Sequence, residues 1–287
     1  MRMNVVVIDP PGYPYAHFLF DTVRMIHYTL LELGVDATLT RNRLEAGRVN
    51  VLCGIHLLAG TSGAEDILRQ EQAIVVLQTE MIHGRTINRE PGDRIDEVVV
   101  PLCQGAVAVW DSSPENIDAL ATMGIQAELL RFGYQPKLCE VQPRTRDVDF
   151  FFYGSITRDR GKILAELGRL GYRVEACFDE AAIFRNDLIA RSEVVLTLRQ
   201  SIEMPHLPHA RILYLVANQA LVAGQGGVND GELSDLFLSC TEDEDPVEFL
   251  RCVRSRNDRE ELRAAHHFRL RRRPMKDYVA PLLEALA

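Results

Sequence analysis

Apolar and polar positions divide the first 135 residues into short buried runs and amphipathic stretches. Continuous β-branched or apolar runs predict strands, and apolar residues spaced three and four apart predict helices over residues 17–33 and 114–123. Gly34 and Gly124 directly follow these helices, at a position that favours glycine. The strands expected here cover residues 4–8, 37–39, 49–52, 73–77 and 106–109.

A second series of the same kind begins at Asp149. Its expected strands cover residues 150–153, 172–177, 194–198, 220–223 and 236–239. Its expected helices cover residues 161–170, 183–191, 208–217 and 246–255, and the chain ends with helices over residues 258–268 and 275–286. Strands that alternate with helices indicate parallel sheets, so the pattern predicts an α/β protein. Residues 135–147, which contain prolines and charges but few apolar side chains, are expected to link the two series.

Polar side chains follow the strands of the first series. His17, His56, Glu80 and Asp111 each lie just past the end of an expected strand or in the loop after it. Parallel sheets bind ligands at the edge formed by the carboxyl ends of their strands. One interpretation is therefore a ligand cleft at this edge. The other is that polar residues simply begin wherever strands stop.

The start of the second series combines a strand, a tight turn and a helix. The apolar run from Phe150 to Tyr153 meets Gly154-Ser155, and basic residues at positions 158, 160 and 162 follow at the helix start. Free backbone N–H groups and the helix dipole stabilise an anion at such a place. The segment therefore indicates a phosphate cradle, with an ordinary turn bearing solvated basic residues as the alternative.

Composition narrows the possible partners and the compartment. The chain has 287 residues and a formal net charge of -9, which argues against broad electrostatic binding to nucleic acid. The six cysteines lie far apart and have no metal-ligand spacing, so free thiols are expected. No signal peptide and no run of about 20 apolar residues is present, so we expect a cytoplasmic protein without a membrane span.

Several segments together resemble those of a known group of proteins. In chain order they are DPPGYPYAH, CGIHLL, VLQTE, VWDSSPENIDAL with MGI, FGYQP, FFYGSITRDR, LIARSEVVLTL and HARILYLVANQALV. In this order they resemble short bacterial glycosyltransferase-like proteins of the GT-B fold. The resemblance implies an α/β protein with two Rossmann-like domains, residues 1–135 and 148–270, and a C-terminal helix, residues 271–287, that crosses back to the first domain.

The resemblance also implies a substrate class. In GT-B enzymes the second domain usually holds a nucleotide-diphosphate sugar and the first holds the acceptor, whose identity this sequence leaves open. On the donor side the candidate residues are Gly154, Ser155, Arg158, Arg160, Arg199, Glu203 and Arg211. On the acceptor side they are Gly12, Tyr13 and His56. No cofactor is expected. His206 and His209 are spaced like metal ligands, but GT-B enzymes do not generally need a bound metal, so no metal site is expected.

Two departures from the family pattern affect the expected activity. Many retaining members have two glutamates, one on either side of the helix over residues 208–217, and the second binds the ribose hydroxyls. In this chain Pro208 stands at the first position, and residues 222–225, at the second, contain no carboxylate. Either Glu203 takes over, or donor binding is altered, or activity has been lost. The hypotheses are a glycosyltransferase, a catalytically silent relative that binds a ligand or partner, and another reaction on a nucleotide sugar, such as epimerisation.

Glycosyl transfer requires a base for the acceptor hydroxyl, and His17 is the first candidate because histidine titrates near neutral pH. Asp111 is expected to orient it, and Glu80 is the alternative base. The structural alternative for His17 is a cap on the helix that follows it.

Overall fold

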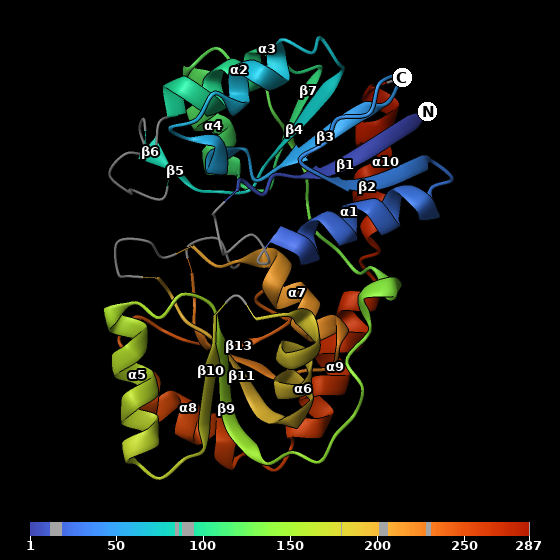
Figure 1. Cartoon of the computed structure of the whole chain (residues 1–287). Coiled ribbons are helices and arrows are strands. Elements are labelled where there is room, and N and C mark those ends of the chain that lie inside the picture. Colours follow the sequence, from blue (N-terminus) through green and yellow to red (C-terminus); the bar gives the residue numbers. More distant parts are fainter. Residues whose placement is uncertain are drawn as a thin grey trace. The chain divides into compact units, whose positions relative to one another are not determined.

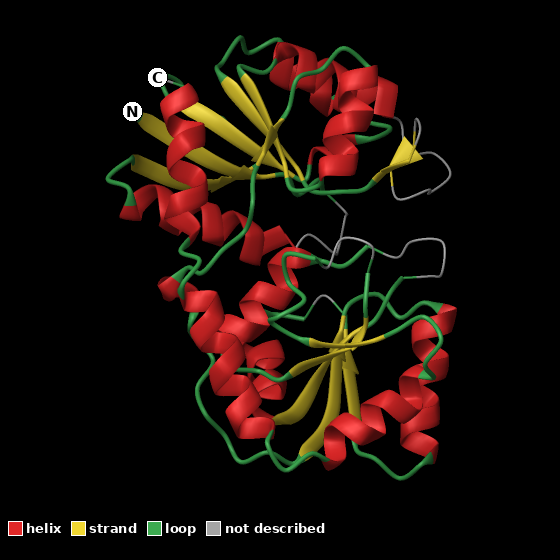
Figure 2. Ribbon diagram, turned by 180° about the vertical axis from the view of Figure 1, so that it is seen from behind, coloured by secondary structure: helices red, strands yellow, loops and turns green. Residues whose placement is uncertain are grey.

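The chain forms two compact units, and each is built around a parallel sheet with helices on both faces (Figures 1 and 2). The computed structural model describes residues 1–11, 19–83, 86–87, 95–178, 180–200, 206–227 and 231–286. Unit 1 consists of Met1–Gly133 and Met275–Ala287, and unit 2 consists of Tyr134–Pro274. In these described parts, no helix has both the length and the apolar content needed to cross a membrane.

The sheet of unit 1 has the strand order β2-β1-β3-β4-β7-β8, and all of its pairs are parallel. All of its strands except the last, which has two residues, overlap the expected ones, because β-branched side chains fit a sheet covered on both faces. They are β1 (Arg2–Val7), β2 (Asp36–Arg41), β3 (Val49–Cys53), β4 (Ile74–Gln78), β7 (Ala108–Asp111) and β8 (Glu128–Leu129). A separate antiparallel pair consists of β5 (Ile82–His83) and β6 (Thr86–Ile87).

The helices of unit 1 include the last one of the chain. They are α1 (Phe20–Glu32), α2 (Gly63–Leu68), α3 (Val100–Gly105), α4 (Pro114–Thr122) and α10 (Met275–Ala285). Helix α10 packs on α1, and Lys276 Nζ lies 3.0 Å from Glu32 Oε1. The predicted return of the C-terminal helix to the first series is thereby confirmed.

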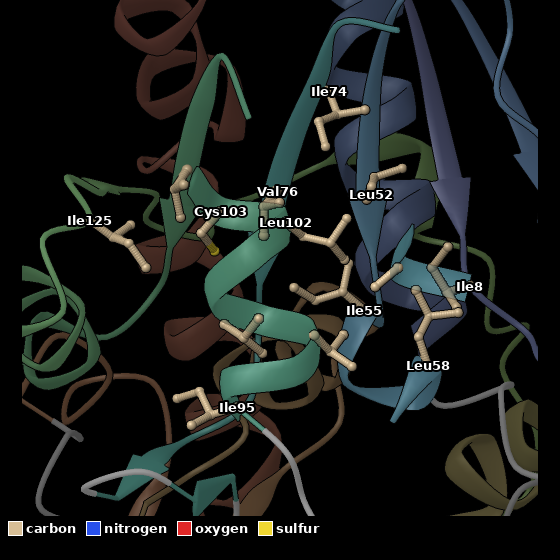
Figure 3. Close-up of a cluster of buried hydrophobic side chains, with 14 of the residues drawn as sticks. Ile8, Leu52, Ile55, Leu58, Ile74, Val76, Ile95, Leu102, Cys103 and Ile125 are labelled. Atoms are coloured by element: carbon tan, nitrogen blue, oxygen red, sulfur yellow. The ribbon is translucent and has the colours of Figure 1, made fainter. Parts of the chain in front are cut away.

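One face of the unit 1 sheet forms a continuous apolar core with the helices above it (Figure 3). Leu52 on β3, Val76 on β4 and Leu102 on α3 are fully buried in this cluster. Burying a side chain of this size stabilises the fold by about 1.5–3 kcal/mol. The core therefore fixes the positions at which β3, β4 and β7 end.

The sheet of unit 2 has the strand order β10-β9-β11-β12-β13 and is also parallel. Its strands are β9 (Val148–Tyr153), β10 (Val174–Cys177), β11 (Ser192–Thr197), β12 (Val222–Gln225) and β13 (Leu238–Cys240). Its helices are α5 (Arg158–Arg169), α6 (Ala182–Arg191), α7 (His209–Ala217), α8 (Pro246–Ser255) and α9 (Arg259–Arg271). Side chains of α5 and α8 cover one sheet face, where Phe150 and Phe152 are buried.

The segment expected to be a linker is held along unit 2. Asn218, just after α7, accepts the N–H of Glu140 at 2.8 Å and that of Val141 at 2.9 Å. The Asn218 Nδ2 donates to the carbonyl of Leu138 at 2.9 Å. A side chain on another element therefore binds the main chain of this segment, and its sequence gives no sign of that contact.

Candidate functional site

The turn after β9 brings two of the predicted donor-side residues together. Gly154 has a φ of +137°, a conformation that side chains other than glycine rarely adopt. The guanidinium group of Arg211, from α7, lies against this turn, because a Cβ on Gly154 would be only 3.1 Å from Arg211 Nη1 and from Nη2. Glycine at this position therefore allows a cation to approach the main chain at the carboxyl edge of the sheet.

A second arginine beside this turn escaped the sequence analysis. The guanidinium carbon of Arg185, from α6, lies 5.3 Å from the ring centre of Tyr153 and 4.6 Å from that of Tyr214. The corresponding atom of Arg211 lies 5.0 Å from the Tyr153 ring. Each such cation–π contact is worth about 0.5–2 kcal/mol. Tyr153, the last residue of β9, therefore holds two guanidinium groups at one sheet edge.

Arg160, in the first turn of α5, is buried and its donors point to main-chain oxygens. Its Nη2 donates to the Leu198 carbonyl at 2.8 Å, and its Nη1 donates to the Ser155 carbonyl at 2.9 Å and to Ser155 Oγ at 3.1 Å. Burial, with a smaller contribution from the positive charge of Arg211, lowers the pKa of Arg160 to about 10. Arg160 therefore fastens the turn after β9 to the end of β11.

The remaining donor-side candidates have different surroundings. Arg158 is exposed, and no other described residue pairs with its side chain. Arg199 lies 3.3 Å from Glu242 through its Nη1 and Oε1, and its own N–H donates to Gln225 Oε1 at 3.1 Å. Gln225 belongs to the segment that lacks the expected carboxylate. Its side-chain amide oxygen accepts the hydrogen bond from the Arg199 main chain. Glu203 lies outside the described residues.

At the carboxyl edge of unit 1, the structure brings Glu80 and His56 together. His56 follows β3 and Glu80 follows β4, and these strands are neighbours in the sheet. His56 Nε2 lies 4.0 Å from Glu80 Oε1, and both side chains are partly accessible, at 11% and 18%. This separation is longer than a direct hydrogen bond between the two atoms and corresponds to an electrostatic contact when the imidazole is protonated. His17, Gly12 and Tyr13 lie outside the described residues.

Asp111, at the end of β7, is fully buried and bound within its own turn. Its carboxylate accepts the N–H of Ser113 at 2.8 Å and the Asn116 side-chain amide at 3.0 and 3.2 Å. Burial raises the pKa of the Asp111 carboxyl to about 7, although these hydrogen bonds act in the opposite direction. The side chain that Asp111 orients in the described structure is thus Asn116.

Histidine, cysteine and acidic side chains do not gather into a metal-ligand set. Within the ranges that the structure describes, no three of them lie close enough together to hold an ion. All six cysteines are free thiols, and Cys53, Cys103 and Cys240 are buried. The candidate chemistry therefore involves arginines in unit 2 and a carboxylate–imidazole pair in unit 1.

The sequence matches no protein-family model, and it matches no curated protein. Solved structures do match the fold at low identity. AviGT4, a glycosyltransferase involved in avilamycin A biosynthesis, is 15% identical with a TM-score of 0.59, and the match covers 99% of this chain and 96% of AviGT4. UDP-GlcNAc 2-epimerase from Neisseria meningitidis, solved bound to UDP-GlcNAc, is 7% identical with a TM-score of 0.56, covering 100% and 99% of the two chains.

The pneumococcal O-GlcNAc transferase GtfA, solved in complex with UDP and GlcNAc, is 8% identical with a TM-score of 0.51. That match covers 92% of this chain and 59% of GtfA. Together with the two parallel Rossmann-like sheets and the returning α10, these likenesses confirm the predicted GT-B fold.

Replacing Arg160 by alanine tests the fastening of the turn. The Arg160→Ala change should lower the free energy of unfolding by about 2–4 kcal/mol, because it leaves main-chain carbonyls without a donor. Arg158→Ala, two residues away and exposed, should change it by no more than about 0.5 kcal/mol. Urea unfolding of both variants measures the difference, and equal losses would contradict the assignment.

The buried Asp111 predicts a pH dependence. Between about pH 4 and the folded-state pKa of about 7, the folded protein keeps a proton that the unfolded chain has lost. The free energy of unfolding should therefore fall as pH rises through this window, by at most about 1.4 kcal/mol per pH unit from this group. Asp111→Asn should show a shallower fall in urea unfolding across the same window. Identical slopes in the two proteins would show that Asp111 does not titrate there.

Proposed function

We propose that this chain transfers a sugar from a nucleotide-diphosphate sugar to an acceptor. The observation that carries the proposal is the cationic carboxyl edge of unit 2, where Arg211 lies against Gly154 and shares the Tyr153 ring with Arg185. Parallel α/β sheets bind ligands at this edge. The GT-B fold, which the chain shares with the transferases AviGT4 and GtfA, supports the same conclusion.

On the donor side, the chemical task is to stabilise the diphosphate as it leaves. Negative charge develops on its oxygens, and fixed cations and helix N-termini stabilise that charge. We assign this role to Arg211 and to the turn of Gly154 and Ser155, with the exposed Arg158 at the start of α5 as an additional contact. Arg160 holds this turn in place, because its guanidinium group donates to the carbonyls of Ser155 and Leu198. Arg199 and Glu203 remain candidates for contacts to the rest of the donor.

On the acceptor side, we propose Glu80 as the base, coupled to His56. The acceptor hydroxyl would give its proton to this pair as its oxygen attacks the anomeric carbon and the nucleoside diphosphate leaves. The support is the 4.0 Å distance between His56 Nε2 and Glu80 Oε1 and the partial exposure of both side chains. His17 is the alternative base, with Gly12 and Tyr13 beside it in the sequence. The cytoplasmic location that we expect from the sequence is compatible with a nucleotide-diphosphate sugar as the substrate.

A second candidate function is epimerisation of a nucleotide sugar. It is favoured by the match to the UDP-GlcNAc 2-epimerase over the whole length of both chains, with a TM-score close to that of AviGT4. The two functions differ in their products, because a transferase releases the nucleoside diphosphate to form a new glycoside, whereas an epimerase returns a nucleotide sugar with one inverted carbon. Proton NMR of UDP-GlcNAc incubated with the protein and candidate acceptors separates them. Unchanged spectra with a panel of nucleotide sugars would favour a catalytically silent relative.

Nucleotide binding gives the most direct test of the donor site. Among UDP, GDP and TDP, we expect the best ligand to lose about tenfold or more in affinity in Arg211→Ala, because one charge-assisted phosphate contact is worth about 1.5–3 kcal/mol. Arg169→Ala is the matched control, because this exposed arginine lies at the other end of α5 and pairs with Glu166. Isothermal titration calorimetry measures both. If no nucleoside diphosphate binds the native protein at about 1 mM, the donor-site assignment fails.

A further inference from the structure

Asn116, in the first turn of α4, binds two separate segments of unit 1 with one side chain, the one that follows β4 and the end of β7. Its Nδ2 donates to the carbonyl of Glu80 at 2.8 Å and to the carboxylate of Asp111 at 3.0 Å, and its Oδ1 accepts the N–H of Ile82 at 2.8 Å. The side chain is buried, and only 1% of the residue is exposed. The donors and acceptors around it also fix its orientation, because Nδ2 faces only acceptors and Oδ1 faces a donor.

The Glu80 and Ile82 contacts enclose the main chain that leads out of β4. Glu80 lies beyond the end of β4, and the Gln78 side chain accepts, through Oε1, the N–H groups of Thr79 at 2.9 Å and Glu80 at 3.4 Å. Asn116 supplies the contacts from the neighbouring helix. The main chain around Glu80, whose side chain lies beside His56, is therefore bound by an amide that belongs to a different element.

We propose that Asn116 is a positioning residue that sets the Glu80 carboxylate relative to the His56 imidazole. Asp111 anchors it, since the carboxylate holds the Nδ2 end of the amide and so turns Oδ1 toward Ile82. The catalytic consequence rests on the proposed role of Glu80 as a base. The position of the Glu80 carboxylate relative to the His56 imidazole can be tested without that role.

An exchange of the two side chains separates positioning from simple support of the fold. Asn116→Asp places a second carboxylate against Asp111 and turns an acceptor toward the Glu80 carbonyl. The double variant Asp111→Asn with Asn116→Asp restores a donor–acceptor pair between these positions and keeps an acceptor for the Ile82 N–H. It does not restore the donor to the Glu80 carbonyl. Stability should therefore recover in part in the double variant, because the pair between positions 111 and 116 is restored while the bond to the Glu80 carbonyl is not, and the placement of Glu80 should not recover.

The first readout is independent of activity. In Asn116→Ala, the ring nitrogen NMR shifts of His56 should change, and the Ile82 amide should exchange its hydrogen faster than in the wild-type protein. Leu120→Val is the matched control, because Leu120 is buried on the same face of the helix, one turn further on, and its apolar side chain makes no hydrogen bond. It should weaken the fold while leaving the His56 signals in place. Unchanged His56 signals in Asn116→Ala would overturn the proposal whatever the protein catalyses.

The second readout is turnover of the nucleotide sugar identified by the screen above. Asn116→Ala should lower kcat about 10- to 100-fold with unchanged UDP affinity, since a displacement of about 1 Å in a catalytic group has effects of this size. The double exchange should regain much of the unfolding midpoint that Asn116→Asp loses, but not kcat. Full recovery of kcat in the double variant would make Asn116 a support of the fold only. A wild-type protein that turns over no nucleotide sugar would refute the proposed function, and the His56 readout would still decide the positioning.

Discussion

Where a buried parallel strand ends, the main chain leaves the sheet and its N–H and C=O groups lose their ladder partners. Groups of this kind cost free energy when they are buried without a partner, so nearly all of them find one. In each unit, one buried polar side chain binds several main-chain groups of this kind. Arg160 binds the carbonyls after β9 and β11, and Asn116 binds the main chain after β4. The candidate sites lie on segments that these two side chains hold.

The two side chains leave different chemistry at the edges that they hold. Arg160 brings a permanent positive charge, and Arg211 lies near enough to contribute to its lowered pKa. Guanidinium groups that repel one another at a sheet edge are stabilised by a bound anion, which is why we propose a diphosphate ligand there. Asn116 brings no charge, and the partly exposed groups near the segment that it binds are a carboxylate and an imidazole.

The fold was largely predictable because its signals are local. Runs such as Phe150–Tyr153 and Val49–Leu52 can only be buried strands between helices, and α8 begins and ends where its pattern predicted. The elements that were missed are too short to show a periodic pattern of apolar residues. Strand β8 has two residues and α3 has six, so neither shows a period that distinguishes helix from strand.

The candidate site was only partly predictable, because the sequence places residues at an edge but does not choose their partners. The strand-end rule correctly placed Glu80, His56 and Asp111 at one edge, yet it could not tell that Asp111 would bind Asn116. Arg185 was missed for a related reason: in the sequence it resembles a solvated helix residue, whereas in the fold it is buried and lies against the rings of Tyr153 and Tyr214.

The negative net charge of the chain gives no sign of the positively charged sheet edge in unit 2. With a formal net charge of -9, an anionic substrate would be repelled by the average surface, and at physiological ionic strength that repulsion fades beyond about 8 Å. A buried or half-buried arginine acts at shorter range and in a lower dielectric, where its attraction is several times stronger than in water. For the proposed diphosphate ligand, Arg211 beside Gly154 should therefore matter more than distant acidic residues. The packing of α6 and α7 on Tyr153 thus places positive charge at this edge, although the chain as a whole is negative.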